Sequence, residues 1–328
     1  MKNHKIFESM ENDIHNSQLS EDEKRRIFRN LFELKEKRLN IMISGATGAG
    51  KSSTINAMFD TNVAKVGTGV DPETMSISKY ELGNMILWDS PGLGDGKEKD
   101  NQHSKAIIKK LNELDEQGEP LIDLVLIILD GSTRDLGTSY ELINSIVIPN
   151  LGENKENRLL VAINQADAAY KGKEAWDYIQ NKPTEKSRKF LDEKVASVKN
   201  RIKEATGVNI DPIYYCAGYQ EDEEEQRPYN LSKLMYLIVK NTPSKKRLLL
   251  ADNISKDAEM WKDDDEIINY NDEIRQGFLE SVVETAKSGA EIGADIGRVF
   301  GKTGETFGRV IGSIGGAVLG GLKSIFSW

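Results

Sequence analysis

The stretch "GATGAGKSS" (residues 45–53) directly follows the short apolar run 39–44. Glycines at the end of a strand can simply form a turn, or they can wrap the backbone so that successive N–H groups converge on an anion. The spacing G-x-x-x-x-G-K-S, with a predicted helix over 51–59 after it, is the context that a phosphate-binding loop requires. The motif positions are Gly45, Gly50, Lys51 and Ser52.

Each part of this loop has an expected role. Lys51 would reach the β- and γ-phosphates of a nucleotide and act in catalysis, and Ser52 would ligate Mg²⁺. The N-terminus of the helix would add its partial positive charge. The predicted nucleotide contacts are Gly45, Ala46, Thr47, Gly48, Ala49, Gly50, Lys51, Ser52 and Ser53.

A second motif, "WDSPGLGDG" (88–96), ends a predicted strand. Taken alone, it could be an ordinary strand-to-loop turn. Beside a phosphate loop, Asp89 is expected in the Mg²⁺ shell, and the Gly92 N–H is expected to meet the γ-phosphate during catalysis.

Two further strand ends predict the base. "VAINQAD" (161–167) supplies Asn164 and Asp167 as N-x-x-D, and a carboxylate can accept from both N1–H and the exocyclic amine of guanine. Adenine lacks that donor pair, so Asp167 would select guanine. In "IYYCAG" (213–218), Cys216 joins the predicted pocket and the Ala217 N–H is expected to donate to guanine O6. The four motifs together predict GTP or GDP with Mg²⁺.

The remaining pattern predicts an α/β fold, a doubly wound, mostly parallel six-stranded sheet. We expect an N-terminal helical segment over 1–38, a GTP-binding domain over 39–242 and a C-terminal helical extension over 243–328. Strands are predicted at 39–44, 76–82, 85–89, 121–130, 158–164 and 212–216. Helices are predicted at 51–59, 101–117, 138–146, 174–205 and 231–239, and the acidic run 221–225 is expected to be a solvated loop.

Composition narrows the class of protein. The 328 residues carry a net charge of −9, which argues against a nucleic-acid partner. Cys216 is the single cysteine, so no intrachain disulfide can form and a reducing compartment is expected. No signal-peptide pattern opens the sequence. We therefore expect a cytoplasmic protein, with peripheral attachment to the inner face of a membrane as an option.

That option comes from the glycine-rich tail, residues 289–328. Of the 33 residues from 289 to 321, 11 are glycine, mostly four residues apart, with Ile, Phe and Val between them. Glycine at this spacing permits close helix approach, as in G-x-x-x-G packing. Three interpretations stay open: membrane association, a helical hairpin docked on this domain or on a second subunit, and a flexible tail.

Taken together, the motifs resemble those of P-loop GTPases of the translation-factor (TRAFAC) class, in the Era/septin-like group. The sequence is similar to Era-like bacterial GTPases over roughly 39–242, and its phosphate loop also resembles those of septin-related immunity-associated and chloroplast-import GTPases. The resemblance implies a switch with slow GTP hydrolysis that is raised by a partner or by a homodimer across the nucleotide face.

Three positions depart from the family pattern. Gln165 replaces the lysine of N-K-x-D, which predicts weaker nucleotide affinity but retained guanine selectivity. Leu93 stands where Ras-like enzymes carry the glutamine that orients water, so water must be positioned otherwise. Gly48 replaces an asparagine that holds potassium in some relatives.

The switch I residue is predicted from "DPETMSIS" (71–78). Thr74 is the first candidate for the catalytic threonine that ligates Mg²⁺ and senses the γ-phosphate, and Thr68 is the alternative. Loops 60–75 and 90–101 are the expected switches.

Three functions remain in competition. The first is a GTPase switch whose nucleotide state controls the C-terminal segment for membrane association or self-association. The second is an Era-like ribosome- or RNA-associated assembly GTPase, and the third is a septin-like nucleotide-binding scaffold with little turnover.

Overall fold

The structure, a computed structural model of the chain, describes residues 7–8, 11, 15, 20–59, 77–94, 96–172, 175–221, 224–251, 253–255 and 257–287. The two switch I candidates, Thr74 and Thr68, lie outside these residues, and so does the glycine-rich tail. Within the described part of the chain, no helix combines the length and the apolar character needed to cross a membrane.

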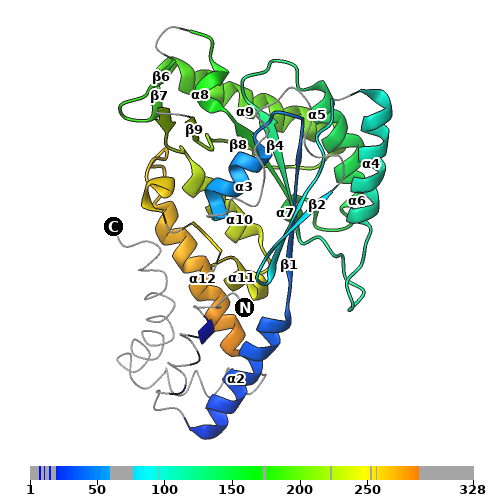
Figure 1. The fold of residues 1–328 in the computed structure, drawn as a ribbon, viewed down its shortest axis with the longest axis vertical. Helices are drawn as coiled ribbons and strands as arrows, with labels where there is room; N and C mark the ends of the chain where they lie inside the picture. Colours follow the sequence, from blue (N-terminus) through cyan, green and yellow to red (C-terminus); the bar gives the residue numbers. More distant parts are fainter. Residues whose placement is uncertain are drawn as a thin grey trace.

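A six-stranded sheet forms the centre of the molecule, in the order β2-β3-β1-β4-β5-β8 (Figure 1). Every neighbouring pair is parallel except β2 and β3, so the predicted fold class is confirmed. The strands are β1 Leu39–Gly45, β2 Ser78–Leu82, β3 Met85–Asp89, β4 Leu124–Asp130, β5 Leu159–Asn164 and β8 Ile213–Tyr214.

Both faces of the sheet are covered, which explains why its central strands are apolar at almost every position. In β1, Ile41 and Ile43 join the apolar cluster on one face and Met42 joins the cluster on the other. The helices that contribute side chains to the first cluster are α2 (Glu21–Glu36), α3 (Lys51–Phe59), α10 (Leu231–Asn241) and α12 (Tyr270–Lys287). The second contains α4 (Lys97–Leu111), the π-helix η1 (Leu142–Val147) and α9 (Glu185–Thr206).

The shorter elements connect these layers. The short helical turns are α5 (Gly137–Glu141), α6 (Ile148–Asn150), α7 (Lys155–Arg158), α8 (Ala166–Ala169), η2 (Ser244–Lys246), α11 (Leu248–Ala251) and η3 (Ala258–Trp261). Two small antiparallel hairpins pair β6 (Trp176–Asp177) with β7 (Lys182–Pro183), and β9 (Tyr219–Glu221) with β10 (Glu224–Gln226).

The prediction of a helix over 174–205 was wrong in its first part. It begins only at Glu185, and the β6–β7 hairpin precedes it. Asp177 Oδ1 accepts hydrogen bonds from the N–H groups of Ile179 and Gln180 at 3.0 and 2.9 Å. This side chain closes a turn where a helix would otherwise continue.

The acidic run 221–225 was also assigned wrongly as a loop, because Glu221 and Glu224 lie in β9 and β10. The helix expected over 138–146 is instead split between α5 and η1. The strand expected from 121 begins at Leu124, and Asp123 just before it donates its N–H to Asn40 O of β1.

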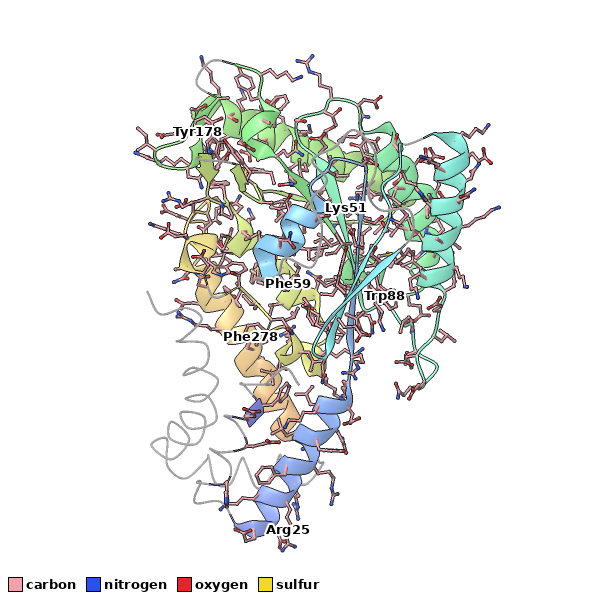
Figure 2. All side chains as sticks on the ribbon, in the orientation of Figure 1. Arg25, Lys51, Phe59, Trp88, Tyr178 and Phe278 are labelled. Carbon is pink, nitrogen blue, oxygen red and sulfur yellow. The ribbon has the colours of Figure 1, made fainter. Side chains whose placement is uncertain are left out.

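The described residues between 244 and 287 pack into the same core as the sheet. Leu248, Leu250, Trp261 and Phe278 are all buried in the first apolar cluster. Figure 2 shows Phe278 on the helix that runs alongside this face. An ion pair of 2.6 Å between Lys246 Nζ and Asp123 Oδ1 ties the same segment to the end of the sheet.

Loss of that ion pair should destabilise the fold. Burial raises the pKa of Asp123, and Lys246 opposes the rise, so Lys246→Met leaves a buried carboxylate without its cation. We expect a loss of about 2 kcal/mol in the free energy of unfolding, somewhat below the range for fully buried pairs because the Lys246 side chain is 21% exposed. Urea unfolding measures this value.

Lys262→Met is the matched control. The Lys262 and Glu259 side chains are 56% and 47% exposed, so losing that pair should cost below ~0.5 kcal/mol. Equal effects of the two substitutions would contradict the importance assigned to the Asp123 pair.

Candidate functional site

The glycine-rich loop lies at the carboxyl end of β1, and α3 begins directly after it. Gly48 and Gly50 adopt φ angles of +80° and +84°, which side-chain-bearing residues rarely adopt. A Cβ on Gly50 would lie 2.2 Å from Asn164 Nδ2. The loop therefore needs glycine at this position for both its conformation and its contact with β5.

Lys51 lies at the first position of α3 and is 9% exposed (Figure 2). Its Nζ donates to Gly45 O at 3.3 Å and to Ala46 O at 3.1 Å. These bonds hold the ammonium against the loop that the sequence predicts to bind phosphate.

Asp89 ends β3 and is 1% exposed. Burial raises the pKa of this carboxyl from 3.8 to about 6, against the opposing effect of the positive charge on Lys51. Asp89 Oδ1 has no hydrogen-bond partner among the described residues. A buried carboxylate oxygen without a partner is costly, and a cation would remove that cost.

The side chains present fit a magnesium ion. Mg²⁺ prefers oxygen ligands, commonly one or two carboxylates with waters and phosphate oxygens. Asp89 offers the unpartnered carboxylate oxygen and Ser52, at the start of α3, offers a hydroxyl.

The segment after Asp89 lies directly on the glycine-rich loop. Leu93 forms a parallel bridge with Ala46, and Thr47 N–H donates to Leu93 O at 3.3 Å. A Cβ on Gly92 would lie 2.3 Å from Thr47 Oγ1, so only glycine fits there. His103, which the motifs did not indicate, is buried in α4 and donates from Nδ1 to Gly92 O at 3.0 Å.

Beside the loop is a pocket of about 250 Å³. It brings together seven of the residues predicted to contact the nucleotide, from the ends of β1, β5 and β8: Gly50, Ser53, Asn164, Gln165, Asp167, Cys216 and Ala217. Sequence reasoning did not name three lining residues: Gly218, which ends the motif "IYYCAG", and Tyr219 and Gln226, which belong to no motif.

Asn164 links the glycine-rich loop to the segment after β8. Its Nδ2 donates to Ala49 O at 3.0 Å, and its Oδ1 accepts from Ala217 N–H at 3.0 Å. The Ala217 N–H was expected to donate to guanine O6, but in this structure it is used by Asn164. The O6 contact stays a prediction.

Asp167 accepts a hydrogen bond on Oδ1 from Cys216 Sγ at 3.3 Å. Burial, with the nearby charge of Asp167, raises the pKa of the Cys216 thiol well above its usual value. The thiol therefore stays protonated and can hold the carboxylate in one orientation.

Gln165, where the family pattern has lysine, adopts a φ of +57° and donates from Nε2 to Gly48 O at 2.9 Å. A neutral amide thus connects the end of β5 to the glycine-rich loop. Leu93 is 4% exposed and packs in the second apolar cluster, so its side chain faces core rather than solvent.

The sequence is similar to one protein family and to several known proteins. Residues 40–165 match the family model described as 50S ribosome-binding GTPase. The uncharacterized protein YfjP of Escherichia coli is 27% identical over 175 residues, which cover 52% of this chain and 55% of YfjP. YkfA, also uncharacterized and from Escherichia coli, is 29% identical over 133 residues, covering 39% and 42%. The chain thus spans about half the length of the curated relatives it matches.

Among solved structures, Toc33 of Arabidopsis thaliana with Mg²⁺ and GMPPNP is similar at 14% identity, over 63% of this chain and 83% of Toc33, with a TM-score of 0.40. The assignment rests on the family match together with the fold and the site. Residues 40–165 are thus similar to a GTPase family, and the fold and the glycine-rich loop described above agree with that match.

Proposed function

We propose that the chain binds GTP with Mg²⁺, hydrolyses it slowly and acts as a switch. The observation that carries the proposal is the buried Asp89, whose unpartnered Oδ1 lies in a site that also holds Lys51 and adjoins the base pocket. In this proposal, Asp89 is the cation ligand, Lys51 is the phosphate-binding ammonium, and Asp167, in the adjoining pocket, is the carboxylate that selects the base.

Each group has one task in this proposal. Lys51 and the amides of the glycine-rich loop bind the phosphates, and Ser52 and Asp89 hold Mg²⁺. When bound, Mg²⁺ neutralises charge on the β- and γ-phosphate oxygens. The Gly92 N–H orients the γ-phosphate, while Leu93 offers no polar group to the attacking water. Because Leu93 cannot orient the attacking water, intrinsic hydrolysis is slow in this proposal. Thr74 or Thr68 is the proposed switch I residue that ligates Mg²⁺.

The proposed homodimer across the nucleotide face gives a direct test. We expect the single-turnover rate constant for GTP hydrolysis to rise with protein concentration, because a second copy supplies what Leu93 does not. A rate that is measurable but independent of concentration would contradict the dimer. Tight GTP binding with no turnover at any concentration would favour the nucleotide-binding scaffold.

The proposed output is nucleotide-dependent membrane association through the glycine-rich tail, on the inner face of a cytoplasmic membrane. Liposome flotation of the full chain with a non-hydrolysable GTP analogue, compared with GDP, tests this. A chain ending at Lys287, the last described residue of α12, is the matched comparison. Equal flotation of both chains would remove the tail from the mechanism.

A ribosome partner is the second candidate, and the description of the matching family favours it. The net charge of −9 does not favour RNA binding, which usually depends on basic surfaces. Salt-sensitive co-sedimentation of the chain with 50S particles would support this candidate over the membrane.

A further inference from the structure

Two side chains of α4 hold the loop that follows β3. His103 donates from Nδ1 to Gly92 O at 3.0 Å, and Asp100 Oδ1 accepts from the Gly94 N–H at 2.9 Å. Residues three positions apart lie on the same face of a helix, so both side chains can reach this loop together. The loop is therefore tied to α4 at two backbone groups, a carbonyl and an amide.

The His103 bond is made in a buried place. The His103 side chain is 4% exposed, and Gly92 is buried as well. A carbonyl oxygen only accepts, so Nδ1 carries the hydrogen of this bond. Because little water reaches the two groups, water would not readily replace the imidazole as the donor to Gly92 O.

The glycine-rich loop contacts the same segment. The Thr47 N–H donates to Leu93 O at 3.3 Å, and a Cβ on Gly92 would lie 2.3 Å from Thr47 Oγ1. Gly92 thus packs directly on the glycine-rich loop while His103 binds its carbonyl. Glycine rotates about its backbone bonds more freely than any other residue, so the orientation of Gly92 depends on these contacts.

In the proposed function, the Gly92 N–H orients the γ-phosphate. We propose that His103 is a positioning residue for this contact: by binding Gly92 O, it restricts the rotation of Gly92 and prepares its amide for the γ-phosphate. A donor that is oriented in advance needs no rearrangement when the phosphate arrives. GDP has no γ-phosphate, so the contribution of His103 is confined to the triphosphate. This inference rests on the proposed function, because it assumes that nucleotide phosphates bind beside Gly92.

Calorimetric titration of the full chain with Mg²⁺ and either GDP or a non-hydrolysable GTP analogue tests this role. His103→Leu fills much of the same space without a donor, so it should weaken the analogue about tenfold and leave GDP within about twofold. His103→Asn keeps an N–H near the position of Nδ1 and should recover most of the loss. The single-turnover rate constant at saturating GTP should fall and recover in the same order.

Asp100→Ala is a second test, which leaves the core intact. The bond from the Gly94 N–H to Asp100 lies at the surface, so its loss should not unfold the chain. We expect the analogue to weaken about threefold and GDP to stay unchanged, because Gly94 is only two residues from Gly92. This variant decides the question even if His103→Leu does not fold.

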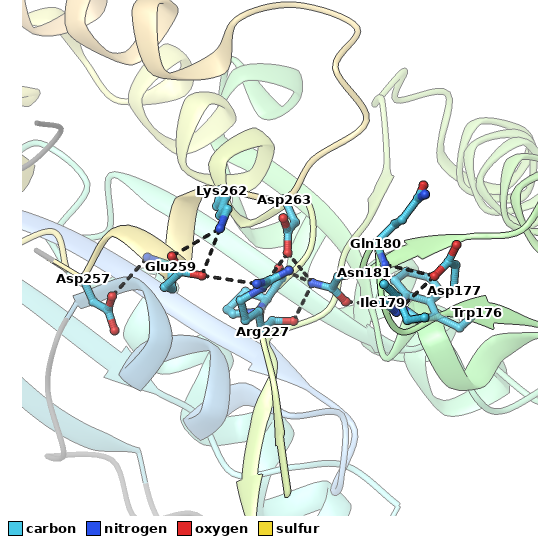
Figure 3. A network of polar contacts seen from close by, with 11 residues as sticks. Trp176, Asp177, Ile179, Gln180, Asn181, Arg227, Asp257, Glu259, Lys262 and Asp263 are labelled. Carbon is cyan, nitrogen blue, oxygen red and sulfur yellow. Dashed lines mark hydrogen bonds and ion pairs between the residues drawn. The ribbon is translucent and has the colours of Figure 1, made fainter. Parts of the chain in front are cut away.

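Arg227→Met is the matched control, since it removes a polar tether from a different segment. Arg227 pairs with Asp263 Oδ2 at 3.0 Å and with Glu259 Oε2 at 3.4 Å, in a network that holds the chain after β10 (Figure 3). The preceding residue, Gln226, lines the base pocket. GDP and the analogue carry the same base, so any effect of Arg227→Met should be equal for both.

Equal weakening of GDP and the analogue by His103→Leu would show that His103 only supports the fold, and would overturn the inference. Unchanged binding of both nucleotides, or no recovery in His103→Asn, would overturn it too. If the unmodified chain binds neither nucleotide, the proposed function itself fails. The two failures are therefore distinguishable.

Discussion

Lys51→Ala is expected to weaken GTP and GDP binding by about a hundredfold or more, equivalent to ~3 kcal/mol. The substitution removes the ammonium that the structure buries against the glycine-rich loop. Several phosphate oxygens would then lose a charge-assisted hydrogen bond in a site that is partly closed to water. Calorimetric titration with Mg²⁺ and each nucleotide gives the affinities.

The same change also removes two bonds to loop carbonyls, so unfolding of the nucleotide-free chain must be measured alongside. Lys109→Ala, an exposed lysine in α4, is the control for general charge. Undiminished nucleotide affinity in a folded Lys51→Ala protein would remove the phosphate-binding role from this loop.

Asp167→Asn is expected to exchange the base preference from guanine to xanthine. The carboxylate can accept from N1–H and from the amine of guanine, whereas an asparagine accepts from N1–H and donates to the 2-keto oxygen of xanthine. GTP binding should fall about a hundredfold, because a buried polar pair is lost and a mismatched one takes its place. XTP binding should rise.

Competition between GTP and XTP for the same chain measures this exchange directly. Cys216→Ala serves as a comparison, since it removes only the thiol that donates to Asp167 at 3.3 Å. It should weaken binding several-fold without changing the preferred base. An Asp167→Asn variant that still prefers GTP over XTP would show that another group selects the base.

Local patterns predicted the sheet and the glycine-rich loop well. The apolar runs of β1, β3 and β5 ended within a residue of their predicted bounds, because each motif begins where its strand stops. The predicted site residues from three strand ends meet in one pocket for the same reason. Parallel strands place their carboxyl ends at one edge of the sheet.

Features that depend on distant contacts were missed. Gln226 belongs to no motif and reaches the pocket only because Gly218 folds back and Tyr229 pairs with Cys216. The acidic residues beside it indicated a solvated loop, since a pattern of like charges gives no sign of backbone pairing. The hydrogen bond from the Ala217 N–H to Asn164 could not be predicted from the sequence either, because the fold decides which acceptor lies beside a backbone amide.

The segment after residue 243 shows a third kind of difference. Its charges indicated an extension with few apolar positions, yet Leu250, Ile254, Trp261 and Ile274 are each at most 1% exposed in the main core. A few large apolar residues suffice when all of them point inward. Their spacing follows no single helical period, since they are distributed over α11, η3, α12 and the turns between them.

Helix α12 is long, so its two ends lie far apart. The hydroxyl of its first residue, Tyr270, donates to Asp265 Oδ1. The other end of the helix packs beside α2 (Figure 1). Its 18 residues span about 27 Å at the rise of an α-helix. Lys287, the last described residue of the helix, therefore lies about 27 Å along the helix from Tyr270, so a lipid surface or protein bound near Lys287 would leave the end that carries Tyr270 free.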